Sequence, residues 1–116
     1  MRAHRLSPEA VRAYRHVPMT DRVRVRVVVV PWLVPGVAAM TVGRLVLVRR
    51  GHEHDELLLA HELVHVQQWR EHRAAFLARY LGEYVRHRAA GMPHQQAYAA
   101  ISFERDARAR ARSASR

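Results

Sequence analysis

The chain has 116 residues, of which 49% are hydrophobic and 26% are charged. This length allows one domain with a single modest core, and the composition is ordinary for a soluble globular protein. The formal net charge of +10 is not ordinary. The absence of cysteine excludes disulfides and metal sites built from thiolates.

All 20 basic residues are arginine. Lysine and asparagine are absent and there is a single isoleucine, which is typical of a GC-rich genome, so part of the arginine excess reflects codon usage. The arginines within residues 2–26 and 105–112 could form a patch that attracts phosphate or an acidic polypeptide. No recognition motif or aromatic stacking platform accompanies them, so nucleic-acid binding is a minor alternative.

The N-terminal segment and the first apolar run give no sign of a membrane span. The start, MRAHRLSPEAVRAYRH, carries charge throughout and lacks the apolar core of a secretory signal. Residues 27–43 are uncharged, but the run is short for a spanning helix and contains Pro31, Pro35 and Gly36. We expect a buried strand followed by an apolar turn, and a cytoplasmic location by default.

The first half of the chain predicts one short helix and two strands. Ser7-Pro8-Glu9 is typical of a helix start, and that helix would end before Pro18. Alternating Arg and Val predict a strand over Arg22–Val30, and a second strand over Met40–Arg50. We expect the two strands to pair antiparallel across the connection at residues 32–38 and to lie against helices, because two strands alone are marginal.

The second half predicts helices. Asp55 is a candidate cap for a helix over Glu56–His72. Further helices are predicted over 74–90, ending at Gly91, over 94–101, and from Phe103 with Ser102 as its cap. The fold class is therefore α+β: a short antiparallel hairpin packed on one central helix and two or three further helices. The chain is expected to be a single domain, 1–116, with an N-terminal helical arm at 1–20 and a basic tail at 106–116 that frays.

The stretch LLLAHELVHVQQW contains the motif HExxH, formed by His61, Glu62 and His65. Residues four apart on a helix lie about 40° apart around its axis, so both imidazoles can reach one ion. Glu62, about 100° from His61, points beside that ion, where a carboxylate can deprotonate water. The motif therefore predicts a zinc site with Glu62 as general base.

The competing interpretation is a buried helix that contains two histidines by chance. A bare HExxH is a moderate signal, because three fixed positions recur in many proteins. The neighbouring residues are apolar on all sides of the helix, which indicates burial. Burial of unpaired polar and charged side chains is strongly unfavourable, and a metal ion would satisfy them. This setting favours zinc ligation over chance.

A zinc ion needs a third protein ligand and keeps one position for water. The position six residues after His65 is Glu71, so the metzincin extension is absent, and His72 lies two turns along the helix, too far to share the ion. Glu104, at the start of a later helix, is the better candidate, and it would complete the His-His-Glu ligation of gluzincins. The alternative is that Glu104 is not a ligand and is simply a carboxylate at the start of a helix, where the helix dipole favours negative charge. The rival ligands are Asp106 and Glu83.

Hydrolysis also needs a donor to the oxygen that becomes negative in the transition state. Tyr98 is the preferred donor because it precedes Glu104, although most such tyrosines simply pack. The other candidates in the sequence are Tyr80, Tyr84, His94 and several arginines. Gln67 and Gln68 could support the ligands or merely face water. His52 and His54, in the loop before the HExxH helix, could lie at the entrance of the site or be ordinary exposed residues.

The order TVGRLVLVRR, AHELVHVQQW, FLARYLGEY and AYAAISFERDA resembles the small bacterial gluzincin-like HExxH domains, over roughly residues 20–110. The matching residues are His61, Glu62 and His65, with Glu104 and Ala97-Tyr98 as softer matches. The resemblance implies a minimal zincin, a zinc-dependent metallopeptidase that acts on peptide or protein. The chain departs from large gluzincins in lacking a second subdomain. The alternative function is a zinc-stabilised binding module whose arginine-rich surface engages an acidic partner or nucleic acid.

Overall fold

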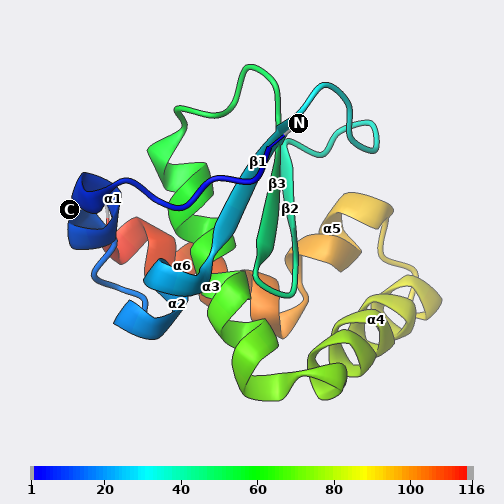
Figure 1. The fold of residues 1–116 in the computed structure, drawn as a ribbon. Helices are drawn as coiled ribbons and strands as arrows, with labels where there is room; N and C mark the ends of the chain where they lie inside the picture. The colour runs from blue at the N-terminus through cyan, green and yellow to red at the C-terminus, as the bar shows by residue number, and fades with distance from the viewer. Residues whose placement is uncertain (1, 115–116) are drawn as a thin grey trace.

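A computed structural model describes residues 2–114 and combines helices with a three-stranded sheet, which confirms the α+β class. Figure 1 shows helix α3 running across one face of the sheet with α6 alongside it. Within the described residues, none of the helices combines the length and the apolar character that crossing a membrane requires.

The N-terminal segment forms two short helices. Helix α1, Pro8–Ala13, begins where predicted, and the Ser7 hydroxyl accepts a hydrogen bond from the Ala10 amide at 3.1 Å. Helix α2, Met19–Arg24, occupies the start of the segment predicted as a strand, so that prediction is wrong before residue 26. The reason is helical spacing: Asp21 and Val25, four residues apart, are both fully buried.

The sheet has the order β1-β3-β2, with β1 at Arg26–Val30, β2 at Ala39–Val42 and β3 at Leu45–Arg49. The second predicted strand is thus two strands, because the chain reverses at Gly43, whose φ of +63° favours glycine. Strand β3 pairs antiparallel with β2 and parallel with β1. The predicted antiparallel pairing between the first and second strand segments is therefore wrong for β1 and β3.

The strand register decides which side chains face α3. Val46 of β3 is fully buried, and its cross-strand partners are Val27 of β1 and Thr41 of β2. Successive residues of a strand point to opposite faces, so Leu45 and Leu47 lie on the other face, where they are half-buried. Thr41 is therefore the polar side chain that β2 directs toward α3.

The predicted C-terminal helices are present, with small differences at their ends. Asp55 caps α3 by accepting from the Leu58 amide at 3.0 Å. A single residue, Arg73, joins α3 to α4. The helices are α3 at Glu56–His72, α4 at Ala74–Ala89, α5 at His94–Ala99 and α6 at Ser102–Ala114.

Helix α6 packs along α3 through small residues. Ala107 and Ala111, four residues apart, are buried. The segment from residue 106 that is expected to fray is therefore helical as far as Ala114, because its alanines fit against the core. The remainder of that segment, residues 115–116, lies outside the described residues.

Replacement of Asp21 by alanine tests what joins α2 to α3. The Asp21 carboxylate is fully buried and accepts two hydrogen bonds from Arg70, at 2.6 and 2.9 Å. We expect Asp21→Ala to lower the free energy of unfolding by about 2 kcal/mol, below the usual range for a buried pair because Arg70 stays partly hydrated. Urea denaturation followed by circular dichroism measures this change. The exposed Glu9→Ala variant should change stability by less than about 0.5 kcal/mol, and equal effects would contradict the role of the pair.

Candidate metal centre

The two histidines of the HExxH motif converge on the same point beside α3. Their rings lie 4.8 Å apart between centroids, and the two Nε2 atoms are 3.2 Å apart. The His65 side chain is 6% exposed and the His61 side chain 17% exposed, so the pair opens toward solvent on the His61 side. The helical spacing in the sequence predicts this convergence.

Glu104, in the first turn of α6, reaches both imidazoles. Its Oε1 atom lies 2.9 Å from His61 Nε2 and 3.1 Å from His65 Nε2. The side chain is 2% exposed. Burial raises the pKa of this carboxyl, but hydrogen bonds from His61 and His65 outweigh that effect and hold the pKa well below its usual range. The predicted third residue is thus brought to the predicted histidines from 39 residues away.

His61, Glu62 and His65 form a group that could hold a metal ion, since one ligand atom from each lies within 4.8 Å of the others. Two carboxylates, those of Glu62 and Glu104, therefore lie close enough to be the third ligand beside the two histidines. The Glu104 carboxylate lies within 3.1 Å of both rings. No hydrogen bond in residues 2–114 joins the Glu62 carboxylate to either ring, which makes Glu104 the better placed of the two.

Glu62 is fixed by strand β2. The Thr41 hydroxyl lies 3.0 Å from Glu62 Oε1, to which it donates, and 3.3 Å from the Glu62 carbonyl oxygen. Burial raises the pKa of Glu62, although the neighbouring histidines act in the opposite direction. The sequence alone does not point to Thr41, because nothing in the motif indicates which strand residue faces the helix.

Gln68 fixes the ring of His65 from the other side. Its amide nitrogen donates to the Phe103 carbonyl at 3.1 Å and to Asp106 at 3.0 Å. Its amide oxygen therefore accepts from His65 Nδ1, at 2.7 Å. Burial lowers the pKa of His65, but the adjacent Glu104 carboxylate outweighs it and the pKa is raised. In the neutral ring this arrangement leaves the lone pair on Nε2, facing Glu104.

Two tyrosines surround the second oxygen of Glu104. The Tyr80 hydroxyl donates to Glu104 Oε2, and burial together with that negative charge raises the pKa of Tyr80. Tyr98, the predicted donor, has its ring 6.4 Å from that of Tyr80 and is 44% exposed. Partial burial and the charge of Glu104 also raise the pKa of Tyr98. Tyr80 therefore holds the carboxylate, while Tyr98 lies beside it and is reachable from solvent.

The other candidates have different contacts. Asp106 accepts from Gln68 and lies 3.5 Å from Arg110, so it supports the centre from outside. Glu83 accepts from the Ser102 amide and hydroxyl, at 2.8 and 2.7 Å. Ser102 therefore begins α6 as a donor to Glu83, which fixes the start of the helix that carries Glu104.

The remaining predicted polar residues form contacts of their own. Tyr84 and His94 are hydrogen-bonded at 2.8 Å, and Gln67 pairs with Glu71 at 3.3 Å. His52 lies 3.0 Å from Arg49. His54 is exposed in the turn before α3.

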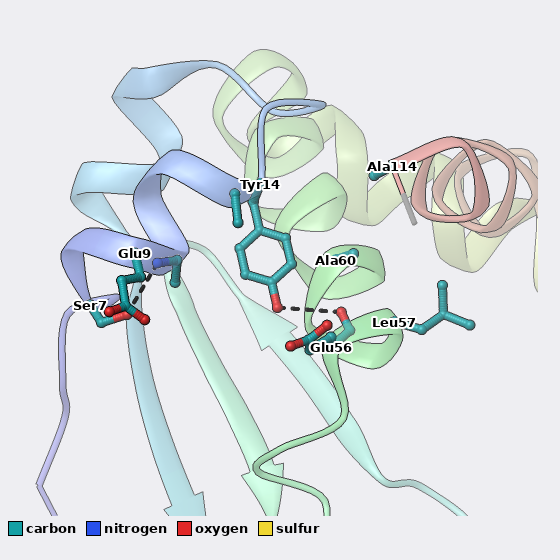
Figure 2. A pocket seen from close by; sticks show the side chains of 9 residues that line it. Ser7, Glu9, Tyr14, Glu56, Leu57, Ala60 and Ala114 are labelled. Atoms are coloured by element: carbon teal, nitrogen blue, oxygen red, sulfur yellow. Dashed lines mark hydrogen bonds between the residues drawn. The ribbon is translucent and has the colours of Figure 1, made fainter. Parts of the chain in front are cut away.

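A cleft of about 360 Å³ lies between α1, the start of α3 and the end of α6. Figure 2 shows the Tyr14 ring pointing toward the start of α3. Its hydroxyl donates to the Glu56 carbonyl at 3.5 Å. Ala114 closes the far side. None of the residues that line this cleft is a predicted ligand or catalytic residue, so it is separate from the candidate metal centre.

Comparison with known proteins gives one family match. The model of the eCIS core domain family matches residues 34–73, about a third of the chain. The matched segment includes the HExxH motif and Thr41 but ends before Glu104. No curated protein and no solved structure matches the chain.

The contact between Gln68 and His65 gives a testable prediction for this centre. We expect Gln68→Ala to weaken binding of a divalent metal by about 10- to 100-fold, because the imidazole loses the partner that fixes its tautomer and orientation. Competition with a chromogenic chelator measures the affinity. The matched control is Gln67→Ala, whose side chain bonds Glu71 and Arg110 instead. Equal losses in both variants would contradict a specific role for Gln68.

Proposed function

We propose that the protein is a zinc-dependent hydrolase of peptide bonds. His61, His65 and Glu104 would hold the ion, and Glu62 would act as general base. The observation that carries this proposal is the convergence of Nε2 of each histidine and Oε1 of Glu104 within 3.2 Å of one another. The resemblance to gluzincin-like domains supports the same assignment.

The distances in the cluster fit a zinc site. Ligand atoms about 2.0–2.2 Å from zinc in tetrahedral geometry lie roughly 3.3–3.5 Å from each other. The observed separations of 2.9, 3.1 and 3.2 Å are a few tenths of an ångström shorter. A doubly protonated His65 would also satisfy Glu104, so metal content is the measurement that separates the two arrangements.

The donor chemistry also fits zinc. Gln68 accepts from His65 Nδ1, which directs the Nε2 lone pair at the carboxylate of Glu104. Two electron-rich atoms that face each other in a buried site repel unless a proton or a cation lies between them. Imidazole nitrogen and carboxylate oxygen are ordinary zinc ligands, and no thiolate is needed.

A bound zinc ion supplies Lewis acidity to the scissile carbonyl and to water. Glu62 removes one proton from the attacking water while the oxygen bonds to the carbonyl carbon, and then delivers that proton to the leaving nitrogen as the C–N bond breaks. Thr41 holds Oε1 of Glu62, which leaves Oε2 free for this transfer. Tyr98 donates to the carbonyl oxygen as it gains negative charge.

The alternative is a zinc-stabilised binding module. The observation that favours it is burial: the side chains of His65 and Glu104 are 6% and 2% exposed, and that of His61 is 17% exposed, which leaves little room for a substrate at the three predicted ligands. In this alternative the ion ties α3 to α6 and turnover is absent. Replacement of Glu62 separates the two functions.

Zinc content tests the ligand set. We expect about one zinc ion per wild-type chain and a loss of most of it in His61→Ala and in Glu104→Ala, because two ligands hold zinc weakly. Elemental analysis of dialysed protein measures the stoichiometry. His54→Ala, in the exposed turn before α3, serves as the control and should keep its zinc. Unchanged zinc in His61→Ala would refute the assignment.

Substitution of the base tests the chemistry. We expect Glu62→Gln to keep zinc but to lose hydrolysis of a fluorescent casein by about 100-fold or more, because the amide cannot accept the proton. The control is Glu56→Gln, an exposed glutamate on the same helix. Retained turnover in Glu62→Gln would exclude its role as base, and an inactive wild type that binds zinc would favour the binding module.

A further inference from the structure

We propose that a second site binds a small phosphate-bearing ligand, in a cleft at the C-terminal end of α3. The cleft has a volume of about 420 Å³ and is lined by four arginines, Arg24, Arg44, Arg70 and Arg73, together with Trp69. Among the described residues, no carboxylate lines it. The residues come from α2, the β2–β3 turn and the α3–α4 junction, so the fold brings them together.

Three of the four guanidinium groups are not paired with acidic residues of the described chain. Within residues 2–114, no hydrogen bond or ion pair joins the side chains of Arg24, Arg44 or Arg73 to a carboxylate. Arg70 is different, because its Nε and one Nη bind the buried Asp21. Arginines that line one cleft without acidic partners give it a positive potential, which attracts an anion. The cleft therefore has an excess of positive donors on three separate elements.

The backbone of Arg73 is a second, independent observation. Its φ of +51° and ψ of −127° make it the one non-glycine residue with positive φ in the described part of the chain. A side chain in such a conformation costs about 1–3 kcal/mol, and glycine would avoid that cost. Codon usage does not explain the residue, since glycine codons are also GC-rich. An arginine at a position that favours glycine points to a role for its side chain.

The competing interpretation is stabilisation of helix ends. Arg70 lies in the last turn of α3 and Arg24 in the last turn of α2, where cations offset the negative end of the dipole. That interpretation does not extend to Arg44, which lies in the turn between β2 and β3. It also does not require the strained backbone of Arg73.

The size and chemistry of the cleft favour phosphate on a small molecule. A volume of about 420 Å³ lies within the range of small-molecule sites. The planar guanidinium donates two parallel hydrogen bonds to phosphate oxygens, and several arginines can share one group that carries more than one charge. Trp69 is held by a hydrogen bond from its Nε1 to the Thr41 carbonyl at 3.2 Å, so its indole is a fixed reporter beside the ligand.

Titration with inorganic pyrophosphate tests the proposal. The test uses a Trp32→Phe variant, so that all tryptophan fluorescence comes from Trp69. We expect a saturable change, weakened at least about 10-fold in Arg44→Gln/Arg73→Gln because charge-assisted hydrogen bonds are lost. The matched control is Arg12→Gln/Arg15→Gln, which removes the same charge from two exposed arginines and should change affinity less than about twofold. Equal weakening in both pairs, or no saturation, would overturn the proposal.

Two further measurements distinguish this site from anion binding at the candidate metal centre and from a purely structural role of Arg73. Protein freed of metal by dialysis against a chelator should bind pyrophosphate as the untreated protein does, whereas a loss would show that the anion binds a metal ion and would overturn the proposal. Arg73→Gly should weaken binding yet raise Tm by about 2–6 °C, because glycine relieves the backbone. A lower Tm with unchanged binding would show that Arg73 is structural. A single-stranded oligonucleotide that displaces pyrophosphate from the parent and binds more tightly than pyrophosphate does would make the cleft a nucleic-acid site and overturn the assignment to a small molecule.

Discussion

The contact between the Glu104 carboxylate and the two imidazoles of α3 is the constraint on which the rest of the structure depends. A carboxylate that is 2% exposed would be strongly unfavourable without partners, so the start of α6 must lie against His61 and His65. Helices α4 and α5 bring the chain back to that position. The Tyr80 hydroxyl donates to the second oxygen of the carboxylate, and Glu83 accepts a hydrogen bond from the amide of Ser102, the first residue of α6. Each of these contacts serves both the fold and the candidate centre, which explains how a small domain keeps the titratable side chains of His65 and Glu104 in its interior.

Strand β2 links the centre to the rest of the molecule through one residue. The Thr41 side chain donates to Glu62, while its carbonyl accepts from Trp69 in the arginine cleft. The middle of α3 and its C-terminal end are therefore connected by β2 as well as by the helix itself. Because the β2–β3 turn carries Arg44, a ligand in the cleft would contact the same hairpin that positions Glu62. The family match at residues 34–73 covers this hairpin and α3, the part of the chain in which both sites meet.

Local signals predict the helices well and the strands poorly. The helix over Glu56–His72 is predicted at both ends, because the cap Asp55 and the apolar run are local features. The strand prediction at Arg22 fails because Arg-Val alternation fits a strand, whereas burial of Asp21 against Arg70 makes this segment helical. The strand over Met40–Arg50 is divided because Gly43 reverses the chain. Whether β1 pairs with β2 or with β3 then depends on which pairing buries more apolar side-chain surface. No short stretch of residues encodes that choice.

The sequence by itself determined the helical spacing that puts His61 and His65 on one side of α3, since four residues make about one turn in any helix. It also limited the third partner to a few acidic residues further along the chain. Only the tertiary structure decided that Glu104 faces the histidines and that Asp106 supports Gln68, because α6 places side chains two residues apart in different directions. The roles of Thr41 and of the arginine cleft likewise arise where elements distant in sequence pack together, and packing is decided by the burial of the whole chain.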